Sequence, residues 1–200
     1  MKKVFFNLKS KTILSVVIIL SSFSVQGFAS SPATITTTED RKIVVDISDL
    51  SGDHATCKIK DQEGAIVYFE KIAQSNLAIK KYDLSQLTPG SYELILEDAM
   101  SIEVIKFELT DAEVKYFDKA KTVYKPTIVE KENKIVYFNQ LALNKAVNIT
   151  ITKNGEYYYN QVYNDLPTIS KKIDFSAAEK GDYLIEVSIL GETFYNNISI

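Results

Sequence analysis

The sequence predicts an all-β protein made of two tandem antiparallel β-sandwiches, and three observations lead to this fold class. The chain contains a long internal repeat, its apolar and polar residues alternate with a period of two, and turn residues separate the alternating stretches. No long segment with a helical period lies between them. Many short alternating segments separated by turns are typical of antiparallel sandwiches.

The repeat relates the two halves of the chain at an offset of 91 residues from Gly64 onward. Residues 82–85 (Tyr-Asp-Leu-Ser) fall on residues 173–176 (Ile-Asp-Phe-Ser). Upstream, residues 42–44 match residues 134–136, both Lys-Ile-Val, at an offset of 92, which indicates one residue gained or lost. A unit of this length fits a small domain and is too long for a solenoid repeat.

Residues 1–29 have the pattern of a cleaved export signal. Four lysines precede an apolar stretch from Thr12 to Leu20, and small residues lead to Ala29, after which we place the cleavage site. The apolar stretch is shorter than the roughly 20 residues of a membrane-spanning helix. We therefore expect a periplasmic or secreted protein with no membrane span after cleavage.

The charge of the mature chain limits its partners. Loss of the four lysines moves the formal net charge from −3 to −7 over the remaining 171 residues. Nucleic acids and anionic membrane surfaces are bound by basic faces, so the balance argues against both.

We predict one sandwich over residues 31–110, a connector over 111–123 and a second sandwich over 124–200, with about seven short strands in each sandwich. Tyr92, Leu94 and Leu96 alternate onto one face, and their counterparts from Tyr183 onward do the same. The connector is charged and has no Gly or Pro, which favours a short ordered helix or edge strand over a flexible tether.

Turn residues support both sandwiches. Asn154-Gly155 between two alternating stretches predicts a tight hairpin. Gly90 and Gly181 each precede an aromatic residue that starts the penultimate strand, and we expect both glycines to supply a positive φ. Tyr92 and Tyr183 are expected to point inward as structural corners.

The segment Leu84-Ser85-Gln86-Leu87-Thr88-Pro89-Gly90-Ser91-Tyr92, preceded by Asp83, resembles a motif of small immunoglobulin-like modules in secreted Bacteroidetes proteins. These include the C-terminal sorting domains of type IX secretion cargo, and residues 174–183 carry a looser version. The resemblance implies immunoglobulin-like sandwiches. The near-terminal Lys and the Asn-Pro of sorting domains are absent, so sorting is kept as an alternative.

Four tyrosines form the candidate binding surface: Tyr157, Tyr158, Tyr159 and Tyr163. On a regular strand, Tyr157 and Tyr159 share one face and Tyr158 takes the other, so at least one ring is expected to be exposed. Exposed aromatic rings bind glycans and proteins. The alternative is ordinary cross-strand packing.

The remaining chemistry-bearing residues point away from catalysis. Cys57 lies on an apolar face and is read as a buried hydrophobe, with a reactive thiol as the alternative. His54, the only histidine, should face away from Cys57, which leaves no catalytic triad and no zinc ligand set. Asp46, Asp49 and Asp53 match no calcium loop and are read as turn residues. We expect no enzyme activity, no cofactor and no bound metal.

Three functions are consistent with these observations. The first is an exported binding protein of unknown ligand that acts through a sheet face, an edge strand or the junction of its modules. The second is secretion cargo with a sorting module at its C-terminus. The third is glycan binding by the tyrosine-rich face.

Overall fold

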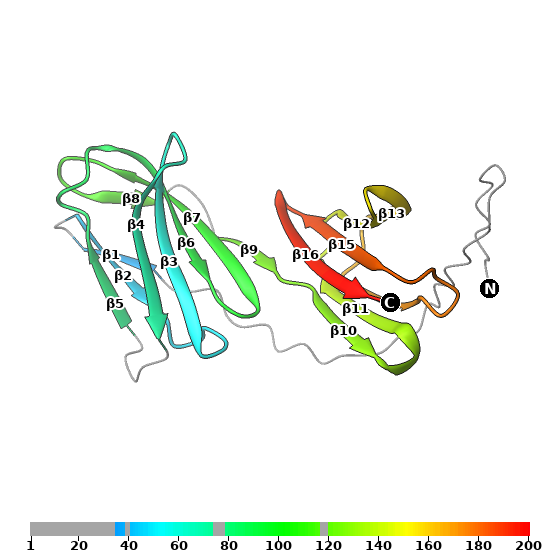
Figure 1. Cartoon of the computed structure of the whole chain (residues 1–200). Coiled ribbons are helices and arrows are strands. Elements are labelled where there is room, and N and C mark those ends of the chain that lie inside the picture. The colour runs from blue at the N-terminus through cyan, green and yellow to red at the C-terminus, as the bar shows by residue number, and fades with distance from the viewer. Residues whose placement is uncertain (1–34, 39–40, 74–78, 117–119) are drawn as a thin grey trace.

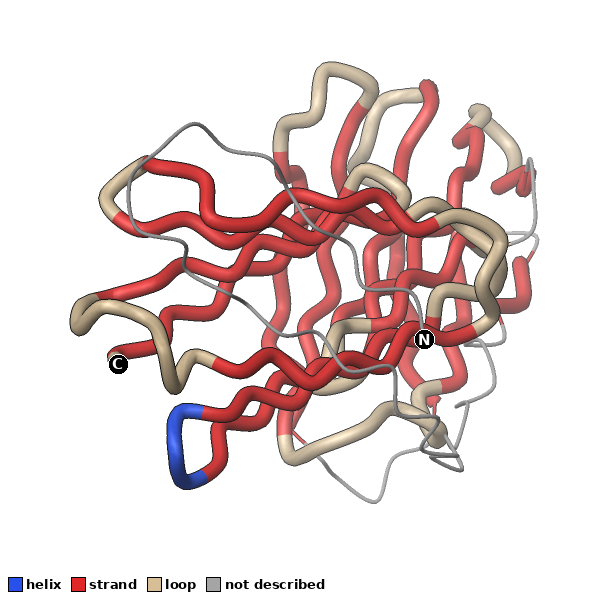
Figure 2. Tube along the Cα trace, turned by 90° about the vertical axis from the view of Figure 1, so that its right-hand side faces the viewer, coloured by secondary structure: helices blue, strands red, loops and turns tan. Residues whose placement is uncertain are grey.

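The computed structural model describes residues 35–38, 41–73, 79–116 and 120–200. The predicted signal peptide lies outside these residues. Nearly every described segment is a strand, and the one helical element is a 3₁₀ turn, η1 (Glu132–Lys134), drawn in blue in Figure 2. All strand pairs are antiparallel.

The described residues up to Tyr124 form nine strands. They are β1 (Ile35–Thr38), β2 (Lys42–Asp46), β3 (His54–Asp61), β4 (Ile66–Ala73), β5 (Ile79–Asp83), β6 (Gly90–Glu97), β7 (Ser101–Leu109), β8 (Val114–Tyr116) and β9 (Lys121–Tyr124).

The described residues from Thr127 onward form seven more strands, which follow β9 in Figure 1. They are β10 (Thr127–Lys131), β11 (Ile135–Leu141), β12 (Val147–Lys153), β13 (Glu156–Tyr163), β14 (Thr168–Asp174), β15 (Asp182–Ile189) and β16 (Glu192–Ser199).

The two halves share one strand order. Sheets β1-β2-β5 and β4-β3-β6-β7 make up the first sandwich, and sheets β10-β11-β14 and β13-β12-β15-β16 make up the second. In each, the first, second and fifth strands face the third, fourth, sixth and seventh, which is the immunoglobulin-like arrangement. The predicted all-β fold of two tandem sandwiches is confirmed.

Each sandwich has its own hydrophobic core. One cluster extends from Ile43 to Val114, and the other extends from Val123 to Ile198. The strands supply these residues at alternate positions, as in β11, where Val136, Phe138 and Gln140 are buried and their neighbours are not. Burial of alternate apolar side chains is therefore what stabilises both units.

The structural register corrects the repeat upstream of Gly64. Ile43 pairs with Tyr82, and Val136 pairs with Ile173. Position 43 is therefore equivalent to position 136, an offset of 93 and not 92. The matching Lys-Ile-Val triplets are one residue out of register, because Ile135 is only half-buried whereas Ile43 is fully buried. The first copy is thus longer than the second by one residue at two places.

The connector is built from edge strands, one of the two forms expected. Both β8 and β9 pair with β7. Val123 of β9 nevertheless belongs to the second core, so this strand is bonded to one sandwich and packed into the other (Figure 1). Lys121 Nζ donates to the Leu190 carbonyl at 2.6 Å, and Lys125 Nζ donates to the Asp98 carbonyl at 2.6 Å. These contacts join the two sandwiches.

Candidate functional site

The strongest surface feature of the described chain is the edge strand β4. Ile66, Val67, Tyr68 and Phe69 follow one another along this strand and are 55%, 40%, 39% and 50% exposed. Strand β4 ends its sheet, and within the described residues no strand pairs with its outer side. An exposed apolar edge strand is a template for pairing with another chain.

A β-bulge explains why four consecutive residues are exposed. The register of β4 against β3 shifts between Ile59 and Lys60, so that Ile59 faces Tyr68 while Lys60 faces Ile66. Val67 is the extra residue. The shift turns Ile66 and Phe69 onto the outer face of the sheet, and a bulge also bends and twists the strand.

An ion pair anchors the inner side of β4. The Lys80 ammonium on β5 donates to Glu70 at 2.6 Å, and the Tyr68 hydroxyl donates to the same carboxylate at 3.3 Å. The hydrogen bond from Lys80 holds the pKa of Glu70 below its ordinary value. The Tyr68 ring packs edge-on against Tyr82 at 5.5 Å between centroids. The backbone of β4 is therefore held in place while its outer side is open.

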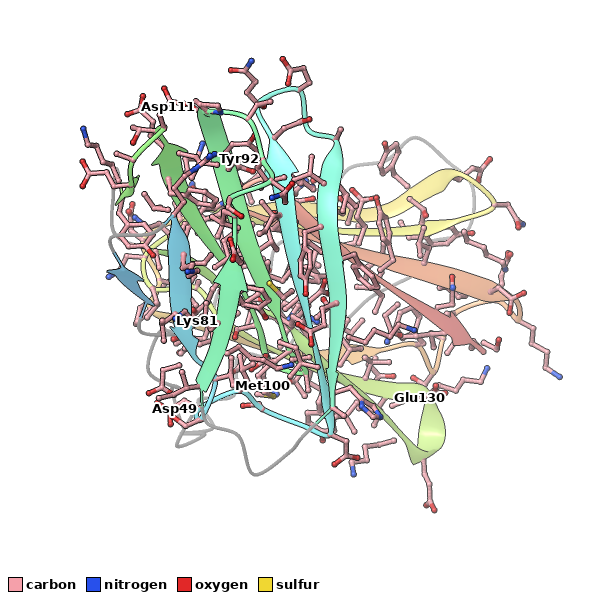
Figure 3. The ribbon with its side chains drawn as sticks, turned by 90° about the vertical axis from the view of Figure 1, so that its left-hand side faces the viewer. Asp49, Lys81, Tyr92, Met100, Asp111 and Glu130 are labelled. Atoms are coloured by element: carbon pink, nitrogen blue, oxygen red, sulfur yellow. The ribbon has the colours of Figure 1, made fainter. Side chains whose placement is uncertain are left out.

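Lysines surround the exposed strand. Lys60 on β3 and Lys71 on β4 have no ion-pair partner within the described residues, whereas Lys58 is paired with Glu97 at 3.1 Å. Lys81 on β5, in the other sheet, is exposed and is labelled in Figure 3. Lys60 and Lys71 therefore place unpaired positive charge beside β4, while the acidic Asp61 and Glu63 lie at the end of β3 and in the turn before β4.

The structure places one of the four clustered tyrosines outward and three against the second core. A second bulge shifts the register of β13 between Ile151 and Thr152. Tyr157 is 72% exposed, whereas Tyr158 packs against the second core and lies edge-on to the buried Tyr183 at 5.3 Å. Tyr159 and Tyr163 also pack against that core, and their hydroxyls share a hydrogen bond. The expectation that Tyr157 and Tyr159 share a face is wrong, because the bulge breaks the strand period between them.

The two corner tyrosines are buried and make matching hydrogen bonds. The Tyr92 hydroxyl donates to the Thr88 carbonyl at 2.7 Å, and the Tyr183 hydroxyl donates to the Glu179 carbonyl at 2.9 Å. The expected positive φ occurs at Gly181, at 143°, and not at Gly90, which lies in the extended start of β6. This difference corrects the expectation for Gly90.

The residues considered for catalysis lie apart. Cys57 is fully buried, and burial raises the pKa of its thiol to about 11, whereas His54 is exposed. The Asp46 carboxylate accepts hydrogen bonds from the backbone and hydroxyl of Ser48, which lower its pKa and make it a turn residue. Among the described residues, no group of three or more His, Cys, Asp or Glu side chains is placed to hold a metal ion.

The sequence carried a signal for the β4 edge that the alternation analysis missed. Residues 66–69 are four apolar residues in a row, directly after the Gly64 turn. Such a run fits a strand buried on both faces as well as an exposed one, because periodicity cannot separate the two cases. Only the position of β4 at the end of its sheet decides between them.

Comparisons with known proteins give no function for this chain. No protein family matches the chain, and no characterised protein does. A biofilm-associated protein BSP domain is 16% identical, over 84% of this chain and 29% of that chain, with a TM-score of 0.26. A tetra-tandem repeat in the extending region of a large adhesion protein is 17% identical, over 84% of this chain and 49% of that one, with a TM-score of 0.26.

The FN1–FN3 domains of chicken CNTN1 are 9% identical, over 80% of this chain and 60% of that chain, with a TM-score of 0.27. The chain thus spans less than two thirds of each of these structures. At such TM-scores the similarity carries no argument about a ligand. In the described part of the chain, no helix has the length and apolar character needed to cross a membrane.

Proposed function

We propose that the protein is an exported, non-enzymatic interaction protein that binds an extended strand of a partner protein along the free edge of β4. The observation that carries this proposal is the exposure of four consecutive apolar side chains, from Ile66 to Phe69, on a strand that ends its sheet. A partner strand would bond to the outward N–H and C=O groups of β4 and cover its apolar side chains.

The charges around β4 support a partner of a particular composition. Lys60 and Lys71 flank the exposed strand without ion-pair partners among the described residues. Complementary charge favours association and sets the register of a partner. We therefore propose that the partner segment alternates apolar and acidic residues.

A photo-crosslinking residue at position 69 tests this proposal in the cells that make the protein. Asn160 is the matched control, because it is exposed on β13 at the position equivalent to Phe69. We expect a defined protein adduct from position 69 and none from position 160. The added Val67→Lys substitution should reduce the adduct several-fold, and hydrogen exchange should slow at β4 amides in the complex. Equal adducts at both positions, or none at position 69, would contradict the proposal.

We propose that residues 31–110 and 124–200 are separate domains joined by 111–123. The two hydrophobic clusters support this division. Because Val123 is buried in the second cluster, we expect the second domain to need strand β9 for full stability. A fragment that begins at Lys121 should unfold cooperatively, whereas one that begins at Tyr124 should be less stable. Circular dichroism during urea unfolding measures both. A fragment from Lys121 that does not fold would contradict the proposal.

Export with cleavage after Ala29 is part of the proposal and rests on the N-terminal pattern. The mass of the protein recovered from the periplasm or medium should correspond to a chain that begins at Ser30. Sorting by the second sandwich is the alternative, and its removal should then leave the first sandwich in the periplasm.

Glycan binding is a second candidate, and its surface differs from the predicted cluster. Tyr157 and Tyr195 are 72% and 64% exposed, and the register places both on the outer face of the β13-β12-β15-β16 sheet. Exposed aromatic rings on a polar sheet face suit sugar stacking. A Tyr157→Ala/Tyr195→Ala variant should lose polysaccharide retention. Unchanged retention would exclude this surface.

A further inference from the structure

The most unusual charged group outside the β4 edge is Lys171 on β14. Its side chain points into the second sandwich between two buried isoleucines of the same strand, and the residue is only 8% exposed. The ammonium lies over the Tyr163 ring, 4.5 Å from its centroid. No ion pair joins Lys171 to an acidic side chain in the described part of the chain. Burial lowers the pKa of this lysine.

The equivalent lysine of the first sandwich has a carboxylate partner. Lys80 faces Val45 in the β2–β5 register as Lys171 faces Phe138 in the β11–β14 register. Lys80 donates to Glu70 at 2.6 Å. The lysine at this position therefore has an acidic partner in the first sandwich and none among the described residues of the second.

The second sandwich has an amide where the first has the carboxylate. Gln161 faces Ile149 as Glu70 faces Cys57, so the two residues occupy equivalent positions. The Gln161 amide donates to the Val162 carbonyl at 2.9 Å and is exposed. It therefore leaves no negative charge beside Lys171.

The tyrosine whose ring lies under the ammonium belongs to a pair of hydroxyls with a spare donor. Tyr159 and Tyr163 are joined through their hydroxyls. In such a pair one hydroxyl donates and the other accepts, and the accepting hydroxyl keeps its own hydrogen. Within the described residues that hydrogen has no acceptor. The second sandwich therefore holds an ammonium over the Tyr163 ring and a spare O–H donor in the hydroxyl pair of that ring, with no acidic partner in the described part of the chain.

The site lies along an open side of the second sandwich. Strand β13 ends one sheet and β14 ends the other, and among the described strands none closes the side between them.

We propose that Lys171, Tyr159 and Tyr163 bind a carboxylate group from outside the chain, in the place that Glu70 occupies in the first sandwich. A buried ammonium without a counter-charge loses hydration that one cation–π contact only partly replaces. A carboxylate restores the missing charge and accepts hydrogen bonds from both the ammonium and the free hydroxyl. This site is separate from the β4 edge, so either proposal can fail alone.

Acetate titration followed by NMR tests the site with the full mature chain. The Cε resonance of Lys171, assigned by its absence in Lys171→Met, should shift with acetate and saturate, whereas acetamide, which has the same shape but no charge, should have no effect. Gln161→Glu supplies the carboxylate from within and should abolish the acetate shift. Glu70→Gln should create the same response at Lys80, where the native protein has none.

The outcomes separate binding from general salt effects. A saturable shift at Lys171 that disappears in Gln161→Glu supports the proposal. A shift that grows linearly with acetate, persists in Gln161→Glu, or is matched by acetamide overturns it. No shift in the native protein also overturns it. Since Gln161→Glu changes an exposed residue, it keeps the fold and leaves Lys171 in place.

Discussion

The two sandwiches share a strand order but fill the side between their fourth and fifth strands differently. In the first, Glu70 and Lys80 form an ion pair beneath an apolar outer edge. In the second, Lys171 has no carboxylate partner among the described residues, and the outer edge is more polar. The same backbone thus supports two different surfaces, for which we propose a protein strand and a carboxylate group as ligands. The difference lies in edge residues, which the core does not restrain.

The cores differ in a compensating way at one pair of positions. In the first sandwich the small Cys57 packs next to the large Tyr82, and the Tyr82 hydroxyl is close to the Cys57 thiol. The second has Ile149 and Ile173 at the equivalent positions. Since interiors are close-packed, a small residue in one strand needs a large one opposite. The two copies therefore reach the same packing by different residues.

Cys57→Ile is the change with the largest expected effect on this comparison. The substitution places at position 57 the isoleucine found at position 149, while Tyr82 keeps its larger side chain. Overpacking against Tyr82 should lower the free energy of unfolding by about 2 kcal/mol. The double variant Cys57→Ile/Tyr82→Ile should recover most of the loss. Urea unfolding measures the three variants. A double variant no more stable than the single one would show that the two pairs are not equivalent.

Tyr183→Phe and Tyr92→Phe test whether the two corners are alike. Each removes one hydrogen bond to a carbonyl four residues upstream, and each should cost about 1 kcal/mol. Thermal unfolding of the two single variants compares them. Similar losses of stability would support the same structural role for both tyrosines. A loss in only one variant would show that the two hydrogen bonds contribute differently.

Glu70→Gln should destabilise the first sandwich by about 0.5 to 1 kcal/mol, because its ion pair with Lys80 is only partly buried. The folded-state pKa of Glu70 is lowered below the ordinary value of 4.5. The stabilisation is therefore complete above pH 4.5 and is lost as pH falls through the lowered pKa. Urea unfolding should show a smaller difference between variant and native protein at pH 3 than at pH 7.

Lys171→Met should show its pH dependence at alkaline pH, above the range in which Glu70 titrates, and should have the smallest effect. The folded-state pKa of Lys171 is lowered below 10.5, so the unfolded chain binds more protons between these two values. The native protein should gain stability relative to Lys171→Met as pH rises through this window. Comparison of the two proteins at each pH cancels the contribution of the tyrosines. A constant difference between pH 7 and pH 10 would contradict burial of this charge.

The sequence by itself determined the strands and their turns. Alternation identified the core faces, as in β6 and β15, and Asn154-Gly155 forms the predicted hairpin, with φ of 51° and 80°. Each of these depends on a few neighbouring residues, because side chains of a strand alternate and a tight turn needs positive φ. The resemblance to secreted modules also agrees with the immunoglobulin-like strand order.

Only the tertiary structure decided which side chains stay outside. Two bulges turned Phe69 and Tyr157 outward and Tyr159 inward, and the register of β11 moved the upstream repeat by one residue. The exposure of β4 and the uncompensated charge of Lys171 depend on which strands end the sheets. Sheet order and bulges arise from contacts between residues far apart in the chain, which a local period does not contain.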